Sequence, residues 1–339
     1  MDVHPWAWGV TLGLIVIMLT VDFVGHVRKP HAPSLKEAAL WSAGYVGIAL
    51  LFGVYVWMVW GGDFGNQYFA GYITEKSLSV DNLFVFVLIM ASFRVPREYQ
   101  QKVLLIGIVI ALALRTVFIF LGAAIVNEFA WVFYIFGAFL LYTAYTQIKA
   151  KDSDDEEFKE NAVLRLVRRI FPTTDGFVGD KMLVVQDGRR HITPMLIVML
   201  AIGSADILFA VDSIPAIFGL TQETYLIFAA NAFSLLGLRQ LFFLIDGLLD
   251  KLVYLNYGLA AILAFIGAKL VIHAMHENEV PFINGGEPIH AIPEISTNVS
   301  LVVIVGILAV TTVASLTFGK KRAEAAATTK EQERELDPR

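Results

Sequence analysis

DILFAVDSIPAI, residues 206–217, is an almost wholly apolar stretch that nevertheless carries two aspartates, Asp206 and Asp212. A carboxylate is costly to bury in a protein core or in lipid unless a partner compensates its charge. Two of them in one apolar segment therefore indicate a functional site, and the rest of the chain should show what compensates them.

The composition of the whole chain indicates a polytopic membrane protein. Of its 339 residues, 57% are hydrophobic and only 17% are charged, and the mean hydropathy is +0.65. Soluble domains of this length carry more charge. The chain has no cysteine, which excludes disulfides, iron–sulfur clusters and thiolate metal sites. We therefore predict an all-α polytopic membrane protein.

Nine apolar segments are long enough to cross about 30 Å of hydrocarbon as helices. The predicted transmembrane helices are residues 6–27, 38–60, 68–93, 102–126, 130–149, 192–219, 225–248, 253–275 and 298–318. Lys and Arg collect in cytoplasmic loops, and nine spans place all the loop Lys and Arg residues on one side. The expected orientation has the N-terminus outside and the C-terminus in the cytoplasm.

The third span repeats the pattern of the sixth. Aligning EKSLSVDNLFVF (75–86) with residues 206–217 pairs Glu75 with Asp206 and Asp81 with Asp212. In the spans that follow, the alignment pairs Arg115 with Arg239. Three spans separate each element from its mate, so the two copies cross the membrane in opposite directions. This inverted 3+3 helix repeat is typical of secondary transporters, which bind substrate near the midplane between the repeats.

The predicted organisation follows from the spans and the repeat. Residues 1–67 form two N-terminal transmembrane helices, 68–149 the first repeat, 150–191 a cytoplasmic loop, 192–275 the second repeat, 276–297 an external loop, 298–319 the last transmembrane helix and 320–339 a disordered cytoplasmic tail. Within the 150–191 loop, an Asp-Gly pair in KMLVVQDGRRHIT predicts a small hairpin.

The buried acids and their polar neighbours form an all-oxygen ligand set, which suits Mn²⁺, Mg²⁺ or Ca²⁺. The candidate metal ligands are Glu75, Asp81, Asn82, Asp206, Asp212 and Ser213. Six residues turn a helix by about 240°, so a straight helix cannot point both its acids into one cavity. Pro215 favours an irregular sixth span, whose freed carbonyls would add ligands.

Other buried polar residues are candidates for supporting roles: Asp22, Arg115, Asn231, Arg239 and Lys269. The structural alternative is that Asp81 and Asp212 form ion pairs with Arg115 and Arg239 and hold the repeats together. Asp22 could reach the inner interface, Lys269 could offset an acid, and Asn231 could line the cavity or join two helices. At the outer end of the eighth span, HAMHENE (273–279) could gather metal or simply begin a solvated loop.

These motifs closely resemble those of the TerC family of integral membrane proteins, which is named for tellurium resistance and grouped with the lysine-exporter superfamily. The resemblance rests on EKSLSVDNLFVF, DILFAVDSIPAIF, LLGLRQLFF and GLAAILAFIGAKL, and covers about residues 70–272. It implies export of divalent metal, chiefly manganese, from the bacterial cytoplasm. The family's acidic positions fall on Glu75, Asp81, Asp206 and Asp212, with Asn82 and Asn231 beside them. Where a Ser-Asn pair is expected, this chain has Ala230–Asn231.

We therefore expect a transporter rather than an enzyme, with Mn²⁺ as substrate, Ca²⁺ and Mg²⁺ as competing candidates, and exchange of metal for protons at the same acids. The expected partners are the lipid bilayer and the metal ion, without an organic cofactor or nucleic acid; the oligomeric state is left open. One alternative is a non-transporting membrane partner that delivers metal to exported proteins or anchors a stress-response complex. An intramembrane hydrolase using Ser204 is a weaker alternative, because no membrane-embedded histidine could activate the serine.

Overall fold

The computed structural model describes residues 1–27, 34–150, 172–174, 176–186, 189–245 and 254–336. The chain is helical, as predicted. The helices of the N-terminal half are α1 (Pro5–Asp22), the short π-helix η1 (Phe23–Val27), α2 (Leu35–Trp60), α3 (Gly62–Ser92), α4 (Arg97–Glu128) and α5 (Val132–Ala150). Those of the C-terminal half are α7 (Pro194–Phe218), α8 (Thr224–Leu235), α9 (Leu238–Ile245), α10 (Leu255–His276), the 3₁₀ turn η3 (Asn284–Gly286) and α11 (Thr297–Leu336).

Seven helical segments within the described residues are long and apolar enough to cross a membrane. They are Pro5–Gly25, Leu35–Trp60, Arg97–Val126, Pro194–Phe218, Thr224–Leu244, Leu255–His276 and Thr297–Thr317. The other two predicted spans coincide with α3 and α5 but are not among the seven; α3 carries Glu75, Lys76 and Asp81 in its middle. The total of nine therefore stays a prediction.

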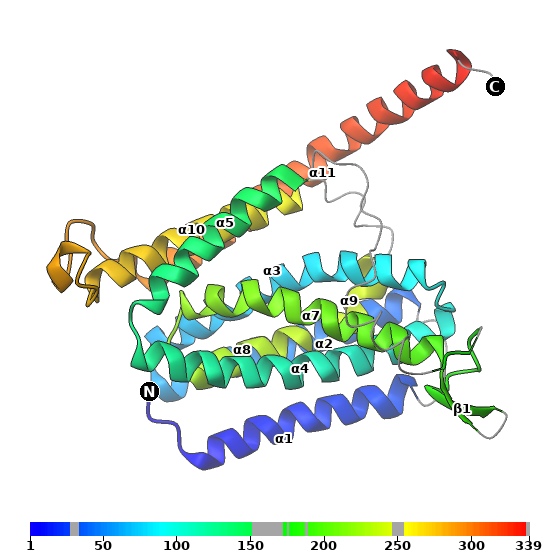
Figure 1. Cartoon of the computed structure of the whole chain (residues 1–339), viewed down its shortest axis with the longest axis horizontal. Coiled ribbons are helices and arrows are strands. Elements are labelled where there is room, and N and C mark those ends of the chain that lie inside the picture. Colours follow the sequence, from blue (N-terminus) through cyan, green and yellow to red (C-terminus); the bar gives the residue numbers. More distant parts are fainter. Residues whose placement is uncertain (28–33, 151–171, 175, 187–188, 246–253, 337–339) are drawn as a thin grey trace.

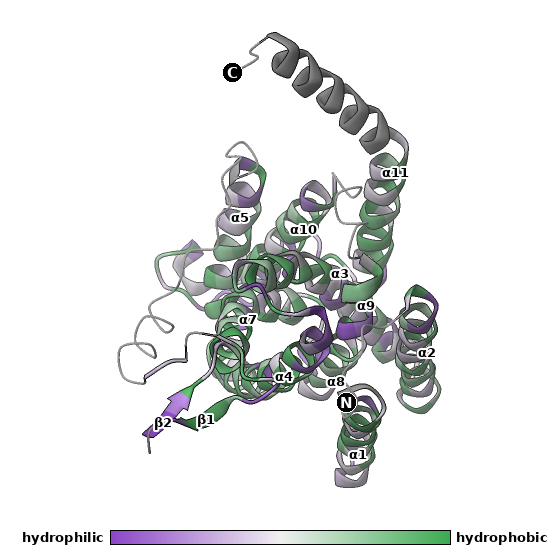
Figure 2. Cartoon of the chain, turned by 90° about the vertical axis from the view of Figure 1, so that its right-hand side faces the viewer, coloured by the Kyte–Doolittle hydropathy of each residue, from purple (hydrophilic) through white to green (hydrophobic). Residues whose placement is uncertain are grey.

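The helices lie roughly along one axis, as Figure 1 shows: α1 borders one side, α5 and α10 run together on the other, and α3, α4, α7 and α8 lie between them. Much of the helical ribbon is coloured as hydrophobic in the view turned by 90°, whereas hydrophilic residues gather at several helix ends and in β2 (Figure 2). The Thr224–Leu244 segment is the most enclosed, with 89% of its apolar window buried, against 22% for Thr297–Thr317. The centre of the bundle is therefore α8 and α9.

The helices of the two proposed repeats pack reciprocally. Helix α3 of the first repeat packs against α8 of the second, and α7 of the second packs against α4 of the first. Helix α5 packs against α10, its own proposed mate. An inverted repeat with a twofold relation would produce this exchange of partners. The reciprocal packing therefore supports the repeat, which stays a prediction.

Helices α5 and α10 approach each other closely at two glycines. A Cβ on Gly137 would lie 2.8 Å from the Gly267 carbonyl oxygen, and a Cβ on Gly267 would lie 3.0 Å from the Gly137 carbonyl oxygen. Both positions therefore require glycine, because any side chain would push the two main chains apart.

The cytoplasmic loop predicted at 150–191 is described only in part, and residues 151–171 lie outside the described part. Strands β1 (Leu183–Gln186) and β2 (Arg189–Ile192) pair antiparallel, with Gln186 opposite Arg189. The pairing confirms the predicted hairpin.

The structure differs from the expected disorder of residues 320–339, because α11 continues to Leu336. The segment KKRAEAAATTKEQEREL is rich in Ala, Glu, Lys and Arg, which are strong helix formers. A charged segment without apolar periodicity can thus extend a transmembrane helix that has already nucleated.

Candidate functional site

Arg115, at the middle of α4, is fully buried and joins acids from two other helices. Its Nε and Nη2 donate to the two carboxylate oxygens of Asp206 on α7, at 2.9 and 3.0 Å. Its Nη1 donates to Oε2 of Glu75 on α3 at 2.9 Å and to Oγ of Ser213 at 3.2 Å. A bidentate arginine–carboxylate pair is among the strongest and most directional ion pairs. We call Glu75, Arg115, Asp206 and Ser213 the central cluster.

The central cluster carries more negative than positive charge. Glu75 and Asp206 are each 1% exposed, and Arg115 supplies the one positive charge in direct contact with them among the described residues. An excess charge in a low-dielectric interior is costly unless an ion or a proton neutralises it. The cluster is therefore suited to hold a further cation.

Two buried side chains near the cluster have polar atoms without a hydrogen-bond partner. They are Oε1 of Glu75 and both amide atoms of Asn231, which faces Glu75 from α8 without hydrogen-bonding geometry. Ser79, one helical turn after Glu75, has a buried hydroxyl that is also unpaired. Nearly all buried polar groups in proteins are paired. These orphaned oxygens are therefore available as ligands.

Asp212 is not part of the central cluster. Its carboxylate lies beside Thr143 of α5, whose hydroxyl donates to it at 3.3 Å. Asp206 and Asp212 therefore face different neighbours, as expected for two residues six positions apart on a straight helix. Helix α7 runs from Pro194 to Phe218 without interruption. The predicted irregularity at Pro215 is therefore wrong. This proline lacks its own N–H donor, but only three residues of α7 follow it, so little helix lies beyond the position where it could bend the chain.

Of the six predicted ligands, the structure joins Glu75, Asp206 and Ser213 directly. Asn82 contacts the cluster too: in the amide orientation that satisfies both its groups, its oxygen accepts from Arg115 Nη2 at 3.2 Å. The side chain of Asp81 lies outside the described part of the structure. No group of three His, Cys, Asp or Glu side chains able to hold a metal is found among the described residues. A site would thus combine two carboxylates with neutral oxygens.

The predicted alternative is wrong for Asp212, which pairs with neither arginine, and its Asp81 half lies outside the described part of the structure. Arg239 instead donates through Nη2 to Oδ1 of Asp22 at 2.8 Å and through Nη1 to Gln101 at 2.7 Å. Tyr45 donates to the same Asp22 oxygen at 2.6 Å. Asp22 is 2% exposed, so it does not reach the interface. It anchors α1 to α9.

The helix break lies in the predicted seventh span, where sequence reasoning missed it. Helix α8 ends at Leu235, α9 begins at Leu238, and Gly237 between them has φ +81°, a conformation that favours glycine. The ammonium of Lys76 donates to the Ser234 carbonyl, 3.0 Å away, at the freed end of α8. The signal was the glycine in LLGLRQ, residues 235–240.

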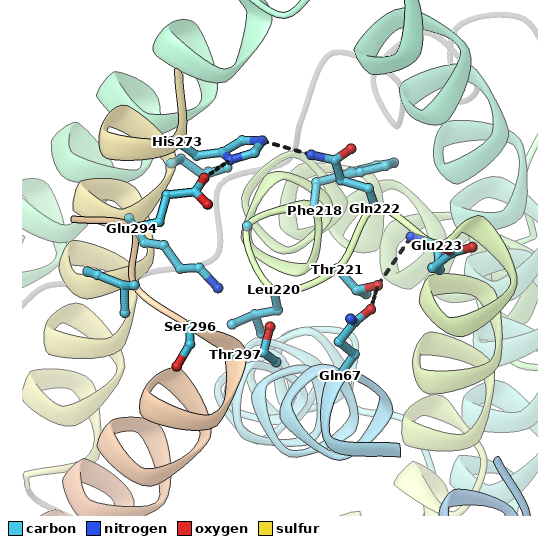
Figure 3. A pocket seen from close by; sticks show the side chains of 14 residues that line it. Gln67, Phe218, Leu220, Thr221, Gln222, Glu223, His273, Glu294, Ser296 and Thr297 are labelled. Atoms are coloured by element: carbon cyan, nitrogen blue, oxygen red, sulfur yellow. Dashed lines mark hydrogen bonds and ion pairs between the residues drawn. The ribbon is translucent and has the colours of Figure 1, made fainter. Parts of the chain in front are cut away.

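A second group of polar residues lines a pocket at the ends of α7 and α10 (Figure 3). His273 hydrogen-bonds to Glu294 at 2.6 Å and to Gln222 at 2.8 Å. The bond from His273 holds the pKa of Glu294 below its ordinary value of 4.5. Lys269, predicted to offset an acid, lines the same pocket. This histidine thus fixes the 276–297 loop to the bundle.

Residues 60–323 match the family model described as the integral membrane protein TerC family. The chain belongs to the TerC family. An uncharacterized membrane protein of Mycobacterium tuberculosis is 52% identical over 94% of this chain and 80% of its own length. One from Myxococcus xanthus is 41% identical over 92% of each chain.

The TerC family relatives also include the Alx protein of Escherichia coli (strain K12), provisionally named a membrane-bound redox modulator. It is 36% identical over 79% of this chain and 86% of its own length. No solved structure matches the chain. The comparisons establish a multi-pass membrane protein of this family.

Proposed function

We propose that this TerC family member exports a divalent metal cation, with Mn²⁺ as the first candidate substrate and Ca²⁺ and Mg²⁺ next, from the bacterial cytoplasm across the inner membrane. The observation that carries the proposal is the central cluster, in which Glu75 and Asp206 share the single guanidinium of Arg115. The proposed orientation has the N-terminus outside and the C-terminus in the cytoplasm.

The ligand chemistry of the cluster favours a hard dication. Carboxylate, hydroxyl and amide oxygens are the ligands that Mn²⁺, Mg²⁺ and Ca²⁺ prefer. Oε1 of Glu75 is unpaired, and an ionised carboxylate has lone pairs to spare even while Arg115 binds it. A cation could therefore bind beside Glu75 and Asn231 while Arg115 is still hydrogen-bonded to Glu75.

Arg115 has a defined part in the proposed cycle. When no metal is bound, its guanidinium neutralises most of the acidic charge, which would otherwise be left uncompensated in a low-dielectric interior. When a dication binds, the guanidinium and the metal compete for the same oxygens. The arginine thus stabilises the site when no metal is bound and limits the affinity for the metal. In the proposed cycle, protons replace the metal on the acids while the empty transporter returns to the cytoplasm-facing state.

The test is Mn²⁺ uptake into proteoliposomes that contain the purified full chain. Glu75→Gln and Asp206→Asn should each lower the initial rate by at least about tenfold, the effect typical of losing a group that orients or binds a metal. Asp63→Asn, which removes an exposed carboxylate from the same helix α3, should transport like the parent.

Two results would overturn the proposal. One is a parent chain that accumulates no Mn²⁺, Ca²⁺ or Mg²⁺ above empty liposomes in either direction of the gradient. The other is transport by Glu75→Gln and Asp206→Asn at the parental rate. Tight metal binding without flux would favour a membrane partner that delivers metal to other proteins. The absence of cysteine means that neither role can use thiol redox chemistry in this chain.

A further inference from the structure

A cavity of about 260 Å³ lies between α3, α5, α7 and α10, beside the central cluster. Its polar lining contains the carboxylate of Asp212 together with hydroxyl and amide groups. The lining residues are Leu78, Asn82, Thr143, Thr146, Gln147, Phe209, Asp212, Ser213 and Leu263. The cavity is thus polar on several sides, although apolar helices build it.

On the α5 side of the cavity, polar residues recur at the spacing of one helical turn. Thr143, Thr146 and Gln147 are related by steps of three and four residues, so they share one face of α5. Thr143 donates to Asp212, and Oε1 of Gln147 is buried without a hydrogen-bond partner. The side chains that alternate with them, Tyr145 and Ile148, are exposed on the outer surface. The polar face therefore points at Asp212 and not at lipid.

The charge of Asp212 is compensated differently from that of Asp206. Asp206 has a bidentate guanidinium, whereas Asp212 forms no ion pair with a described Lys, Arg or His side chain. A carboxylate inside a bundle at membrane depth marks a site for an ion or a proton. The hydroxyl and amide oxygens that line the same cavity would add to this carboxylate as ligands for a cation.

Two wall residues of the cavity contact Arg115 of the central cluster. Ser213 lines the cavity and accepts from Arg115 at 3.2 Å. Asn82 also lines it, and its amide oxygen accepts from the same arginine in the orientation that satisfies both its groups. One layer of side chains therefore separates the cavity from Arg115, so a cation in the cavity would repel the guanidinium directly.

We infer that this cavity is a second cation site, in which Asp212, Thr143, Thr146 and Gln147 bind a hard cation beside the central cluster. The inference rests on the proposed transport function and adds to it a binding step. All its ligands are oxygens, which excludes soft metals and suits either Mn²⁺ or Na⁺. An occupied cavity would loosen Arg115 from the acids and so prime the central cluster for the transported ion.

Binding to the purified full chain tests the inference independently of transport. Bound Mn²⁺ is counted from the loss of the free Mn²⁺ signal in electron paramagnetic resonance, with and without NaCl. The variants are Thr143→Val and Gln147→Met, which remove oxygens but keep size. The control is Thr116→Val in α4, whose hydroxyl bonds only to its own helix at Leu112.

If the cavity takes Mn²⁺, the parent binds two ions, and both variants weaken one by at least about tenfold while Asp206→Asn weakens the other. If it takes Na⁺, the parent binds one Mn²⁺ with a sodium dependence that both variants shift by a similar factor. Parental Mn²⁺ and Na⁺ binding in both variants would overturn the inference, even when flux is normal. A parent without flux whose binding still changes in the variants would refute transport and leave the second site standing.

Discussion

Arg239 donates to Asp22 at 2.8 Å, so the second arginine of the proposed repeat is bound by a helix that lies outside the repeat. Its mate Arg115 binds Glu75 and Asp206 instead. The two aligned arginines thus have different structural roles. Arg115 binds the acids of the central cluster, and Arg239 joins α1 to α9, the helix that follows the break.

The Asp22–Arg239 pair should be strongly coupled in stability. Asp22→Asn leaves the buried guanidinium of Arg239 without a carboxylate, which should lower the free energy of unfolding by about 3–5 kcal/mol, and Arg239→Gln removes one charge partner of Asp22. The double variant should lose much less than the sum, as measured by denaturant unfolding in detergent. The half-exposed pair Lys102–Asp180 is the control, where either change should cost under about 1 kcal/mol. Additive losses at the buried pair would contradict the prediction.

Removing Arg115 should be more damaging than removing one of its acids. Arg115→Gln leaves two buried carboxylates facing each other and should cost at least about 3–5 kcal/mol. Asp206→Asn leaves one carboxylate and one guanidinium, so the charges balance and the loss should be clearly smaller. Thermal unfolding of the two variants in the same detergent decides the order. An equal or larger loss for Asp206→Asn would mean that the cluster is not in excess negative charge.

The fold class was readable from sequence, because it depends on the length and hydropathy of the apolar segments. The identity of the ion pairs was not. Alignment of the repeats identifies equivalent positions, whereas pairing depends on the rotation of each helix about its axis, and Asp212 faces Thr143 rather than Arg115. The alignment did not identify Asp22 as the partner of Arg239, because Asp22 lies on α1, outside the repeat. Pro215 attracted attention as a break, although the helix breaks at Gly237, which has a positive φ.

Gly237→Ala should destabilise the chain, since its φ of +81° strains any residue with a Cβ, and that Cβ would lie 2.8 Å from Cβ of Tyr45. The expected cost is about 1–3 kcal/mol. Gly306→Ala in α11 has open space around it and should be neutral or slightly stabilising. Unfolding midpoints of the two variants give the comparison. If they shift alike, the α8–α9 break does not depend on this glycine.

Gly137→Ala should disrupt the contact between α5 and α10, because its Cβ would lie 2.8 Å from a main-chain oxygen that cannot rotate away. We expect a loss of about 1–3 kcal/mol from this overpacking. Gly13→Ala in α1, which has nothing within 4 Å, serves as the matched control. A disulfide-free crosslinking readout, such as paired photo-crosslinkers on α5 and α10, should show a lower yield in Gly137→Ala alone.

The loop after α10 should loosen in acid. The pKa of Glu294 is held below its ordinary 4.5 by the hydrogen bond from His273, so the bond contributes fully above pH 4.5. Its contribution is lost as pH falls through the lowered value, since protonation removes the acceptor charge. Glu294 is half exposed, so the effect should stay under about 1 kcal/mol. Hydrogen exchange of residues 277–296 should quicken in this range for the parent, whereas Glu294→Gln should exchange fast throughout.

The glycine contact between α5 and α10 joins one proposed repeat to the other at main-chain distance. Two halves packed in this way should stay in contact when the protein changes state, because separating them would lose the close packing of the two helices at Gly137 and Gly267. The expected relative motion of the two halves is a rotation about the contact between α5 and α10. A rotation about an axis along α5 and α10 would move α3 and α7 in opposite directions. It would change the position of Glu75 relative to Asp206.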